Sequence, residues 1–232
     1  VNAAAYTAVD RAEDDVAAAF RANAEAPGQL ARACAARDAL LVHYSTDYVF
    51  DGQSTRPYRP DDATSPLGTY GASKLAGEVA IRESGCRHMI FRTAWVYGNH
   101  GNNFMRTMLR VGAERDQLRV VADQFGTPTS AQLIADVTGQ VIESGSLRSG
   151  TWHLTALGET SWHAFAQEIF DQAFALGLLT RMPEVTAIST SEYPTRARRP
   201  AYSCLDTSTL REDFGLSLPD WRQALARVLE SA

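Results

Sequence analysis

The sequence predicts an α/β fold in which a doubly wound parallel sheet is combined with a smaller C-terminal α/β lobe. Short apolar runs alternate with longer helical patterns through the first half of the chain, as they do when crossover helices connect parallel strands. A long polar loop follows one strand at the end where open sheets place their sites. Beyond Gly150 the strands become shorter. We therefore expect one domain over residues 1–150 and a lobe mainly over residues 151–232, with the chain crossing between the two.

The elements follow from the pattern in order. Residues 1–5 are expected to be the end of a strand, and residues 10–37, rich in Ala and Arg, a helix broken near Pro27 and Gly28. The apolar run 40–45 predicts a buried strand, and the Gly, Pro and Asp content of residues 51–66 predicts a loop.

The remaining elements alternate in the same way. A helix over residues 70–84 is expected to end at Gly85. Further strands are expected over 88–97, 118–122, 151–154 and 185–188, and further helices over 103–115, 130–142, 162–176 and 219–229.

Composition excludes several classes of protein. The net charge is -5 with 45% hydrophobic and 21% charged residues, which is typical of a globular domain and gives no electrostatic reason to bind nucleic acid. Three widely spaced cysteines, Cys34, Cys86 and Cys204, predict neither disulfides nor a zinc site. No apolar run reaches the about 18 residues of a membrane helix. We expect a cytoplasmic protein that binds no membrane.

The chain uses arginine almost exclusively as its cation. Of 22 Lys and Arg residues only Lys74 is lysine, and it stands four residues after Tyr70. Residues four apart share one face of a helix, so the ammonium can lie beside the phenol. A compact cation there would favour the phenolate and lower the pKa of Tyr70 from about 10 towards neutrality, which suits acid-base catalysis. Arginine, broad and planar, is a poor substitute.

Several blocks of sequence resemble the dTDP-4-dehydrorhamnose reductase family of extended short-chain dehydrogenases/reductases. The Y-x-x-x-K spacing alone specifies only the superfamily, whereas the blocks around it are more particular. They are VNAAAYTAVDRAE (1–13), HYSTDYVFDG (43–52), YGASKLAGE (70–78), FRTAWVYG (91–98), GNNF (101–104), DQFGTPT (123–129), GETSWHAFA (158–166) and ARRPAYSCLDTS (197–208).

The resemblance implies a Rossmann-like fold and the reduction of the C4 ketone of dTDP-4-dehydro-L-rhamnose to dTDP-L-rhamnose by NADPH or NADH. It implies that Tyr70 is the proton donor, that Lys74 holds the nicotinamide ribose, and that the Thr46 hydroxyl completes the catalytic set. Implied cofactor contacts are Ala5, Tyr6, Thr7, Tyr70 and Lys74, and implied substrate contacts are Thr46, Asp47 and Trp95.

Side-chain chemistry adds three candidates for recognition of the nucleotide sugar. Asn103 and Phe104 follow a Gly-Asn pair, and the guanidinium fork of Arg199 suits a diphosphate. The five histidines lack the paired spacing of metal ligands, so no metal is predicted. A homodimer is one assembly that the sequence leaves open.

One feature of the superfamily is absent from the sequence. Its dinucleotide site uses a glycine-rich turn after the first strand, and no G-x-x-G-x-x-G occurs in these 232 residues. We therefore expect the first strands of the Rossmann-like domain to be missing and the chain alone to bind NAD(P)H poorly. The chain is then a fragment of an enzyme, has its first part elsewhere, or has lost its cofactor lobe.

Two other functions are alternatives. A chain without its cofactor lobe would be a non-catalytic nucleotide-sugar-binding or regulatory subunit. An epimerase or dehydratase would keep Tyr70 and Lys74 but needs further acid-base residues. Asp47 has no Glu beside it, which argues against a dehydratase.

Overall fold

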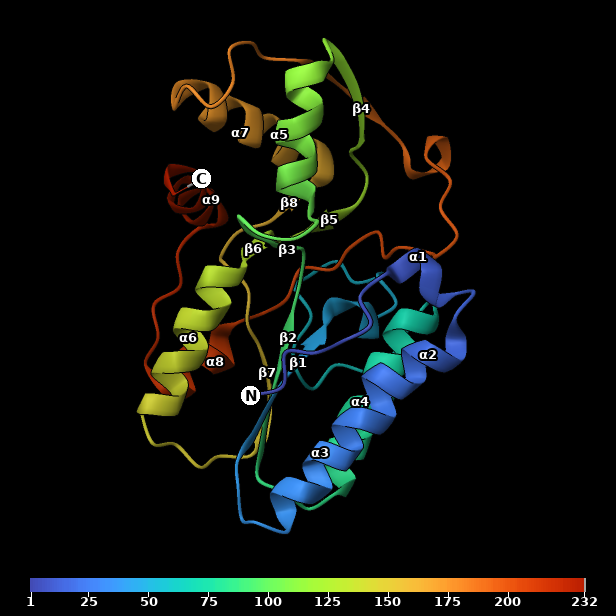
Figure 1. Ribbon diagram of the computed structural model, residues 1–232, viewed down its shortest axis with the longest axis vertical. Helices are drawn as coiled ribbons and strands as arrows, with labels where there is room; N and C mark the ends of the chain where they lie inside the picture. The colour runs from blue at the N-terminus through green and yellow to red at the C-terminus, as the bar shows by residue number, and fades with distance from the viewer. Residues whose placement is uncertain (232) are drawn as a thin grey trace.

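A three-stranded parallel sheet forms the centre of the larger lobe in the computed structural model, which describes residues 1–231 (Figure 1). Its strands are β1 (Leu41–Thr46), β2 (His88–Thr93) and β7 (Gly150–His153), in the order β1-β2-β7. Residues 1–5 form no continuous strand, although Asn2 makes an isolated parallel bridge to His43 of β1. The predicted α/β class with a parallel sheet is confirmed.

Helices cover both faces of this sheet, which is why most residues of its strands are buried. In Figure 1, α3 (Ala26–Ala35) and α4 (Thr69–Glu83) lie on one side of the strands, and α6 (Ala131–Glu143) and α8 (Ser208–Phe214) lie on the other. Alternate side chains of each strand point to opposite faces of the sheet. Leu41 and Ile90 pack with Ala31 and Ile81, whereas Val42, Met89 and Phe91 pack with Ile134, Val137 and Leu210.

The first helical region continues through the predicted break. Helices α1 (Val9–Ala12) and α2 (Val16–Phe20) are followed by a π-helical turn, Arg21–Glu25, that leads directly into α3. The break expected near Pro27 is therefore wrong. Pro27 stands in the first turn of α3, where a missing N–H costs least, and the hydrogen-bond pattern changes in the π turn before it.

The smaller lobe takes elements from both sides of Gly150. Its elements are α5 (Phe104–Glu114), β4 (Gln117–Val121), α7 (Trp162–Ala175), β9 (Glu184–Ile188) and α9 (Trp221–Glu230). Strands β4 and β9 pair in parallel, and the apolar core joins Met105 and Leu118 to Phe165, Trp221 and Leu225. These elements lie together above the sheet in Figure 1.

The boundary expected at residue 150 therefore does not separate the two lobes. Helix α5 and strand β4 precede it but belong to the smaller lobe, whereas β7 and α8 follow it but belong to the main sheet and its cover. Apolar strands of similar length carry no signal for which sheet they join, because pairing is decided by tertiary contacts.

Two short strand pairs lie between the lobes. They are β3 (Val96–Tyr97) with β6 (Thr129–Ser130), and β5 (Phe125–Gly126) with β8 (Thr160–Ser161). The strand expected over residues 88–97 is divided at Trp95, whose φ of 47° ends β2 before β3 begins. No helix within residues 1–231 is long and apolar enough to cross a membrane.

Candidate active site

The candidate site lies where the carboxyl ends of β1 and β2 meet the first turn of α4. Thr46 ends β1 opposite Thr93 at the end of β2. Asp47 and Trp95 follow these two strand ends, and Tyr70 stands in the first turn of α4. Carboxyl ends of neighbouring parallel strands share one edge of the sheet, so this edge brings together residues that are distant in sequence.

The start of α4 is fixed by contacts from other segments. Glu13 accepts hydrogen bonds from the backbone N–H of Thr69 at 2.8 Å and from its hydroxyl at 3.1 Å, which caps the helix in trans. A Cβ at Gly71 would lie 2.1 Å from the backbone oxygen of Tyr48, so only glycine permits this approach. The Tyr48 and Tyr70 rings meet edge to face, with centroids 5.5 Å apart.

Lys74 is enclosed one turn after Tyr70. Its residue is 3% exposed, and its Nζ donates to the backbone oxygen of Tyr44 at 2.6 Å. Burial lowers the pKa of Lys74 to about 8, while the charge of Glu78 raises it. A solvated surface lysine is therefore excluded, and the slot beside β1 fits a compact ammonium.

The pKa of Tyr70 moves in the direction opposite to that expected. It is raised to about 12 because the phenol is desolvated; the hydroxyl of Thr46 lowers it in part, and the charge of Asp47 adds to the rise. The expectation that Lys74 lowers the pKa of Tyr70 is wrong for the structure described. The ammonium is bonded to the Tyr44 carbonyl, and desolvation of the phenol dominates.

Thr46 and Asp47 form a buried pair at the end of β1. Thr46 Oγ1 donates to Asp47 Oδ1 at 2.9 Å and accepts from the N–H of Tyr48 at 3.2 Å, so it also caps the short 3₁₀ turn Asp47–Val49. Asp47 is 2% exposed, and its Oδ2 has no hydrogen-bond partner among the described residues. Burial raises the pKa of Asp47 to about 6, and Ser203 and Thr46 oppose the rise. Oδ2 of Asp47 can therefore accept a hydrogen bond from a ligand hydroxyl.

Trp95 is held in an unusual backbone conformation at the junction of the lobes. Its φ of 47° is rare for a non-glycine residue and marks local strain. Its indole stacks on Trp162 of α7, with centroids 3.5 Å apart and an interplanar angle of 6°. A Cβ at Gly126 would lie 2.4 Å from this indole. The sequence indicated Trp95 but not its partner Trp162.

Phe104 and Arg199 meet at a cavity in the smaller lobe. The cavity is about 320 Å³ and is also lined by Trp162, Arg119 and Tyr193. It combines aromatic faces with two guanidinium groups, a chemistry that suits a base and a diphosphate. The fork of Arg199 is already engaged, because it holds Asp10 at 3.1 and 2.7 Å.

Asn103 does not join this cavity. Its side chain caps α5 by accepting from Arg106 N–H at 3.1 Å, and its amide donates to the carbonyls of Gly98 at 2.8 Å and His100 at 3.2 Å. It lines a different hollow, beside Gln132 and Arg227. The side-chain amide of Asn103, which suggested recognition of a ligand, instead makes its hydrogen bonds to the backbone around it.

The segment Ala5–Thr7 lies against α4 through a single buried side chain. Asn23, which is 0% exposed, accepts from the N–H of Tyr6 at 2.8 Å and donates to its carbonyl at 3.0 Å and to Ser73 Oγ at 3.0 Å. Ser73 precedes Lys74, so the predicted cofactor residues are neighbours, with Ala5 and Thr7 exposed. No sequence motif singles out Asn23.

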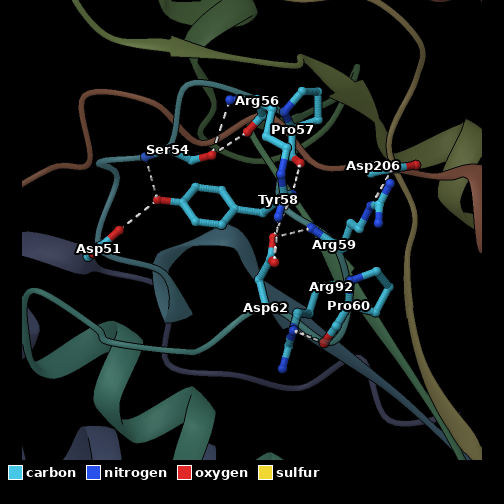
Figure 2. A network of polar contacts seen from close by, with 10 residues as sticks. All are labelled: Asp51, Ser54, Arg56, Pro57, Tyr58, Arg59, Pro60, Asp62, Arg92 and Asp206. Atoms are coloured by element: carbon cyan, nitrogen blue, oxygen red, sulfur yellow. Dashed lines mark hydrogen bonds and ion pairs between the residues drawn. The ribbon is translucent and has the colours of Figure 1, made fainter.

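The loop after the site is pinned by polar contacts (Figure 2). The hydroxyl of Tyr58 donates to Asp51 at 2.7 Å, and Arg56 pairs with Asp62. Arg92 of β2 donates to the carbonyl of Pro60 at 3.1 Å. The predicted loop is thus an ordered segment attached to the sheet. Within residues 1–231, no group of three His, Cys, Asp or Glu side chains could hold a metal ion.

Comparisons with known proteins agree with this geometry. The whole chain, residues 1–232, matches the family model described as the RmlD substrate binding domain. A dTDP-4-dehydrorhamnose reductase of Burkholderia thailandensis is 49% identical over 97% of this chain and 78% of its own length, and one of Escherichia coli K12 is 45% identical over 99% and 78%. The structure of a Bacillus anthracis dTDP-4-dehydrorhamnose reductase in complex with NADP superposes with a TM-score of 0.92 at 38% identity, covering 99% of this chain and 79% of that one.

The parallel sheet, with Tyr70 and Lys74 on one helix at its carboxyl edge, defines an extended short-chain dehydrogenase/reductase. Within that class, the chain belongs to the dTDP-4-dehydrorhamnose reductase family, as its blocks of sequence predicted.

Proposed function

We propose that this chain carries the substrate site and the proton donor of an NAD(P)H-dependent reductase that converts dTDP-4-dehydro-L-rhamnose to dTDP-L-rhamnose. The observation that carries the proposal is the placement of Tyr70 and buried Lys74 on one face of α4, at the sheet edge that also presents Asp47 and Trp95. The reaction adds a hydride to C4 and a proton to its oxygen.

Tyr70 supplies the proton. With a pKa of about 12 the phenol is fully protonated at neutral pH, which is the state that a donor requires. The O–H bond of Tyr70 breaks as the proton passes to the C4 oxygen, and the Thr46 hydroxyl turns its one hydrogen from Asp47 to the phenolate that remains. When bound, NAD(P)H supplies the hydride to C4.

The residues present fit the nicotinamide end of that cofactor. Lys74 uses one ammonium hydrogen on the Tyr44 carbonyl, and an ammonium has three to donate. The exposed segment Ala5–Thr7 is clamped beside Ser73, next to Lys74. Lys74 and this segment would hold the nicotinamide ribose.

The substrate lies between the lobes in this proposal. The unpaired Oδ2 of Asp47 accepts a sugar hydroxyl, and the strained Trp95 offers its indole face to the deoxyhexose. Phe104 packs on the nucleotide, and Arg199 exchanges part of its contact with Asp10 for the diphosphate. Asn103 has no place in this set.

The relatives named above favour the reductase over the other two functions. They bear the reductase name at 45% and 49% identity over almost the whole chain, which argues against a non-catalytic subunit or a dehydratase. A homodimer stays a prediction. So does a cytoplasmic location, which is consistent with three free cysteines.

Tyr70→Phe tests the proposal in the complete gene product that contains this chain. We expect at least about a 100-fold loss of NADPH oxidation with the keto-sugar, the scale of general acid catalysis, while dTDP-sugar affinity stays within about twofold. Tyr44→Phe removes a phenol that instead bonds Thr138 at 2.9 Å and serves as the control. Near-normal turnover of Tyr70→Phe would contradict the proposal.

A further inference from the structure

A buried carboxylate lies on the same face of α4 as the two proposed catalytic residues. Glu78 follows Lys74 by four residues and Tyr70 by eight, and it is 0% exposed. Residues at this spacing line up along one side of a helix. Nothing in the proposed reaction uses Glu78 directly, and a carboxylate is rarely buried without a partner.

Glu78 is held by a bidentate ion pair. Arg92, which is 3% exposed, donates from Nε to Oε1 at 2.9 Å and from Nη2 to Oε2 at 2.7 Å. Arg82 adds a bond to Oε2 at 3.2 Å. The remaining Nη1 of Arg92 reaches the carbonyl of Pro60, so the pair joins α4, β2 and the loop of Figure 2.

The other groups around Lys74 do not neutralise its charge. Asn2 Oδ1 accepts from Ala4 N–H at 3.2 Å, which turns the Asn2 amide nitrogen towards His43 Nδ1 at 3.0 Å. His43 Nε2, on the other side of the ring, lies 3.4 Å from Lys74 Nζ. Burial lowers the pKa of His43 to about 3, so this ring is neutral.

Glu78 is the buried carboxylate that stands one turn after Lys74 on the same face of α4. The ionisable and polar groups that face this region are His43, Ser45 and the Tyr44 carbonyl from β1, Arg92 from β2, His153 from β7, Glu78 and Arg82 from α4, and Asn23 through Ser73 from the π turn. Of the described residues, Glu78 is the one whose charge raises the pKa of Lys74 against burial.

A purely structural role explains the pair poorly. Desolvating two charges costs several kcal/mol, and replacing such pairs with apolar residues is often neutral or stabilising. A role in setting the charge of a neighbour accounts for an acid at this position, because an apolar residue cannot perform it.

We propose that Glu78 is a positioning residue for the reaction, which, pinned by Arg92, holds Lys74 as a cation at the nicotinamide ribose and fixes α4 against the sheet. The inference rests on the proposed function for the role of Lys74 in catalysis. The charge relation between Glu78 and Lys74 is independent of it.

The single lysine makes the test direct. Lys74 is the one lysine of these 232 residues, so in the complete gene product labelled with ¹³C at lysine Cε its signal is identified by its loss in Lys74→Met, and the shift of that signal against pH reports the pKa of Lys74. In Glu78→Gln, which keeps the shape and removes the charge, we expect that pKa to fall by about one pH unit. Glu83→Gln, an exposed acid on the same helix, should leave it unchanged.

A second variant guards against loss of folding. If Glu78→Gln does not fold, the double variant Glu78→Met with Arg92→Met leaves neither member of the Arg92–Glu78 pair without its partner. A downward shift is again expected, but a smaller one than in Glu78→Gln, because the cation of Arg92 is lost together with the carboxylate. A Lys74 pKa within about 0.3 pH units of the parent in the folded variant overturns the proposal.

Activity separates this inference from the proposed function. In the complete gene product, loss of NADPH oxidation at high pH should begin at a lower pH in Glu78→Gln, because Lys74 loses its proton sooner. A shifted signal with an unmoved alkaline limb overturns the positioning role. If the Lys74 signal shifts in Glu78→Gln but the parent protein has no reductase activity, the proposed function is overturned and the charge relation between Glu78 and Lys74 stands.

Discussion

Lys74 combines the rarest side chain of the sequence with one of the most enclosed positions of the site. It is the only lysine among 22 Lys and Arg residues, it is 3% exposed, and its Nζ is 2.6 Å from the Tyr44 carbonyl. A guanidinium is broader than an ammonium and cannot place one compact charge in this slot. The chemical argument for lysine is therefore also a steric one.

Lys74→Arg should consequently inactivate the enzyme although the charge is kept. We expect NADPH oxidation by the complete gene product to fall at least about 100-fold, and the free energy of unfolding to fall by about 1 to 3 kcal/mol from overpacking. Arg115→Lys, the reverse exchange at an exposed position, should change neither quantity. Full activity in Lys74→Arg would refute this account of the lysine.

Burial of Asp47 in the site lowers the free energy of unfolding at neutral pH. Its pKa of about 6 in the folded chain lies above the ordinary value of 3.8, so the folded state binds more protons than the unfolded state between these values. Stability therefore falls as pH rises through that window, and the ionised carboxylate is a liability at neutral pH.

Asp47→Asn should remove that cost. We expect the free energy of unfolding to rise by about 2 to 3 kcal/mol at pH 8, with the difference from the parent shrinking towards pH 4, as chemical denaturation at several pH values would measure. Affinity for the nucleotide sugar should fall at the same time. A variant that is less stable than the parent at pH 8 would contradict the proposed cause of the shift.

At the scale of elements, α4 is positioned by two glycines that permit close backbone approach. A Cβ at Gly77 would lie 2.0 Å from the carbonyl oxygen of Asn23 in the π turn, and one at Gly71 would meet Tyr48. The helix that carries Tyr70 and Lys74 thus packs directly on the backbone of its neighbours. Its register there decides where both side chains lie.

Gly77→Ala should therefore destabilise the chain despite the better helix propensity of alanine. We expect a loss of about 2 kcal/mol or more in thermal or chemical unfolding. Gly139→Ala is the matched control in α6, where a new Cβ meets nothing within 4 Å, and it should stabilise by about 0.5 to 1 kcal/mol. Equal effects of the two substitutions would show that the approach of α4 is not tight.

At the scale of the whole molecule, the site depends on contacts between the lobes. Trp95 leaves the main sheet and stacks on Trp162 of the smaller lobe, and Arg199 from the C-terminal region pairs with Asp10 near the start of the chain. The cavity lined by Phe104, Trp162 and Arg199 draws on both of these contacts. A nucleotide there would touch residues separated by almost 100 positions.

Binding of dTDP alone should report this arrangement. We expect it to quench tryptophan fluorescence, with most of the change lost in Trp162→Phe and retained in Trp152→Phe, whose indole packs on the main sheet. Arg199→Met should weaken binding about tenfold, whereas Arg198→Met at its exposed neighbour should not. If dTDP quenches the fluorescence of Trp162→Phe as strongly as that of the parent, dTDP does not occupy this cavity.

The sequence indicated most elements to within a few residues, because strands buried on both faces and amphipathic helices leave strong local patterns. It also indicated Tyr70 and Lys74 through their helical spacing, and Thr46 through the family resemblance. It did not predict Trp162, Asn23, Glu78 or Arg92, whose importance comes from partners between 14 and 67 residues away. Their side chains are ordinary until the fold brings those partners near.

By itself, then, the sequence determined the α/β class, the reductase family and the Tyr70–Lys74 pair, because each is written in the spacing and identity of nearby residues. Only the tertiary structure decided that β4 belongs to the smaller lobe and β7 to the main sheet, that Asn103 caps a helix, and that the pKa of Tyr70 rises instead of falling. Strand pairing, hydrogen-bond satisfaction and desolvation depend on what surrounds a residue in space, and that is fixed only when distant segments pack together.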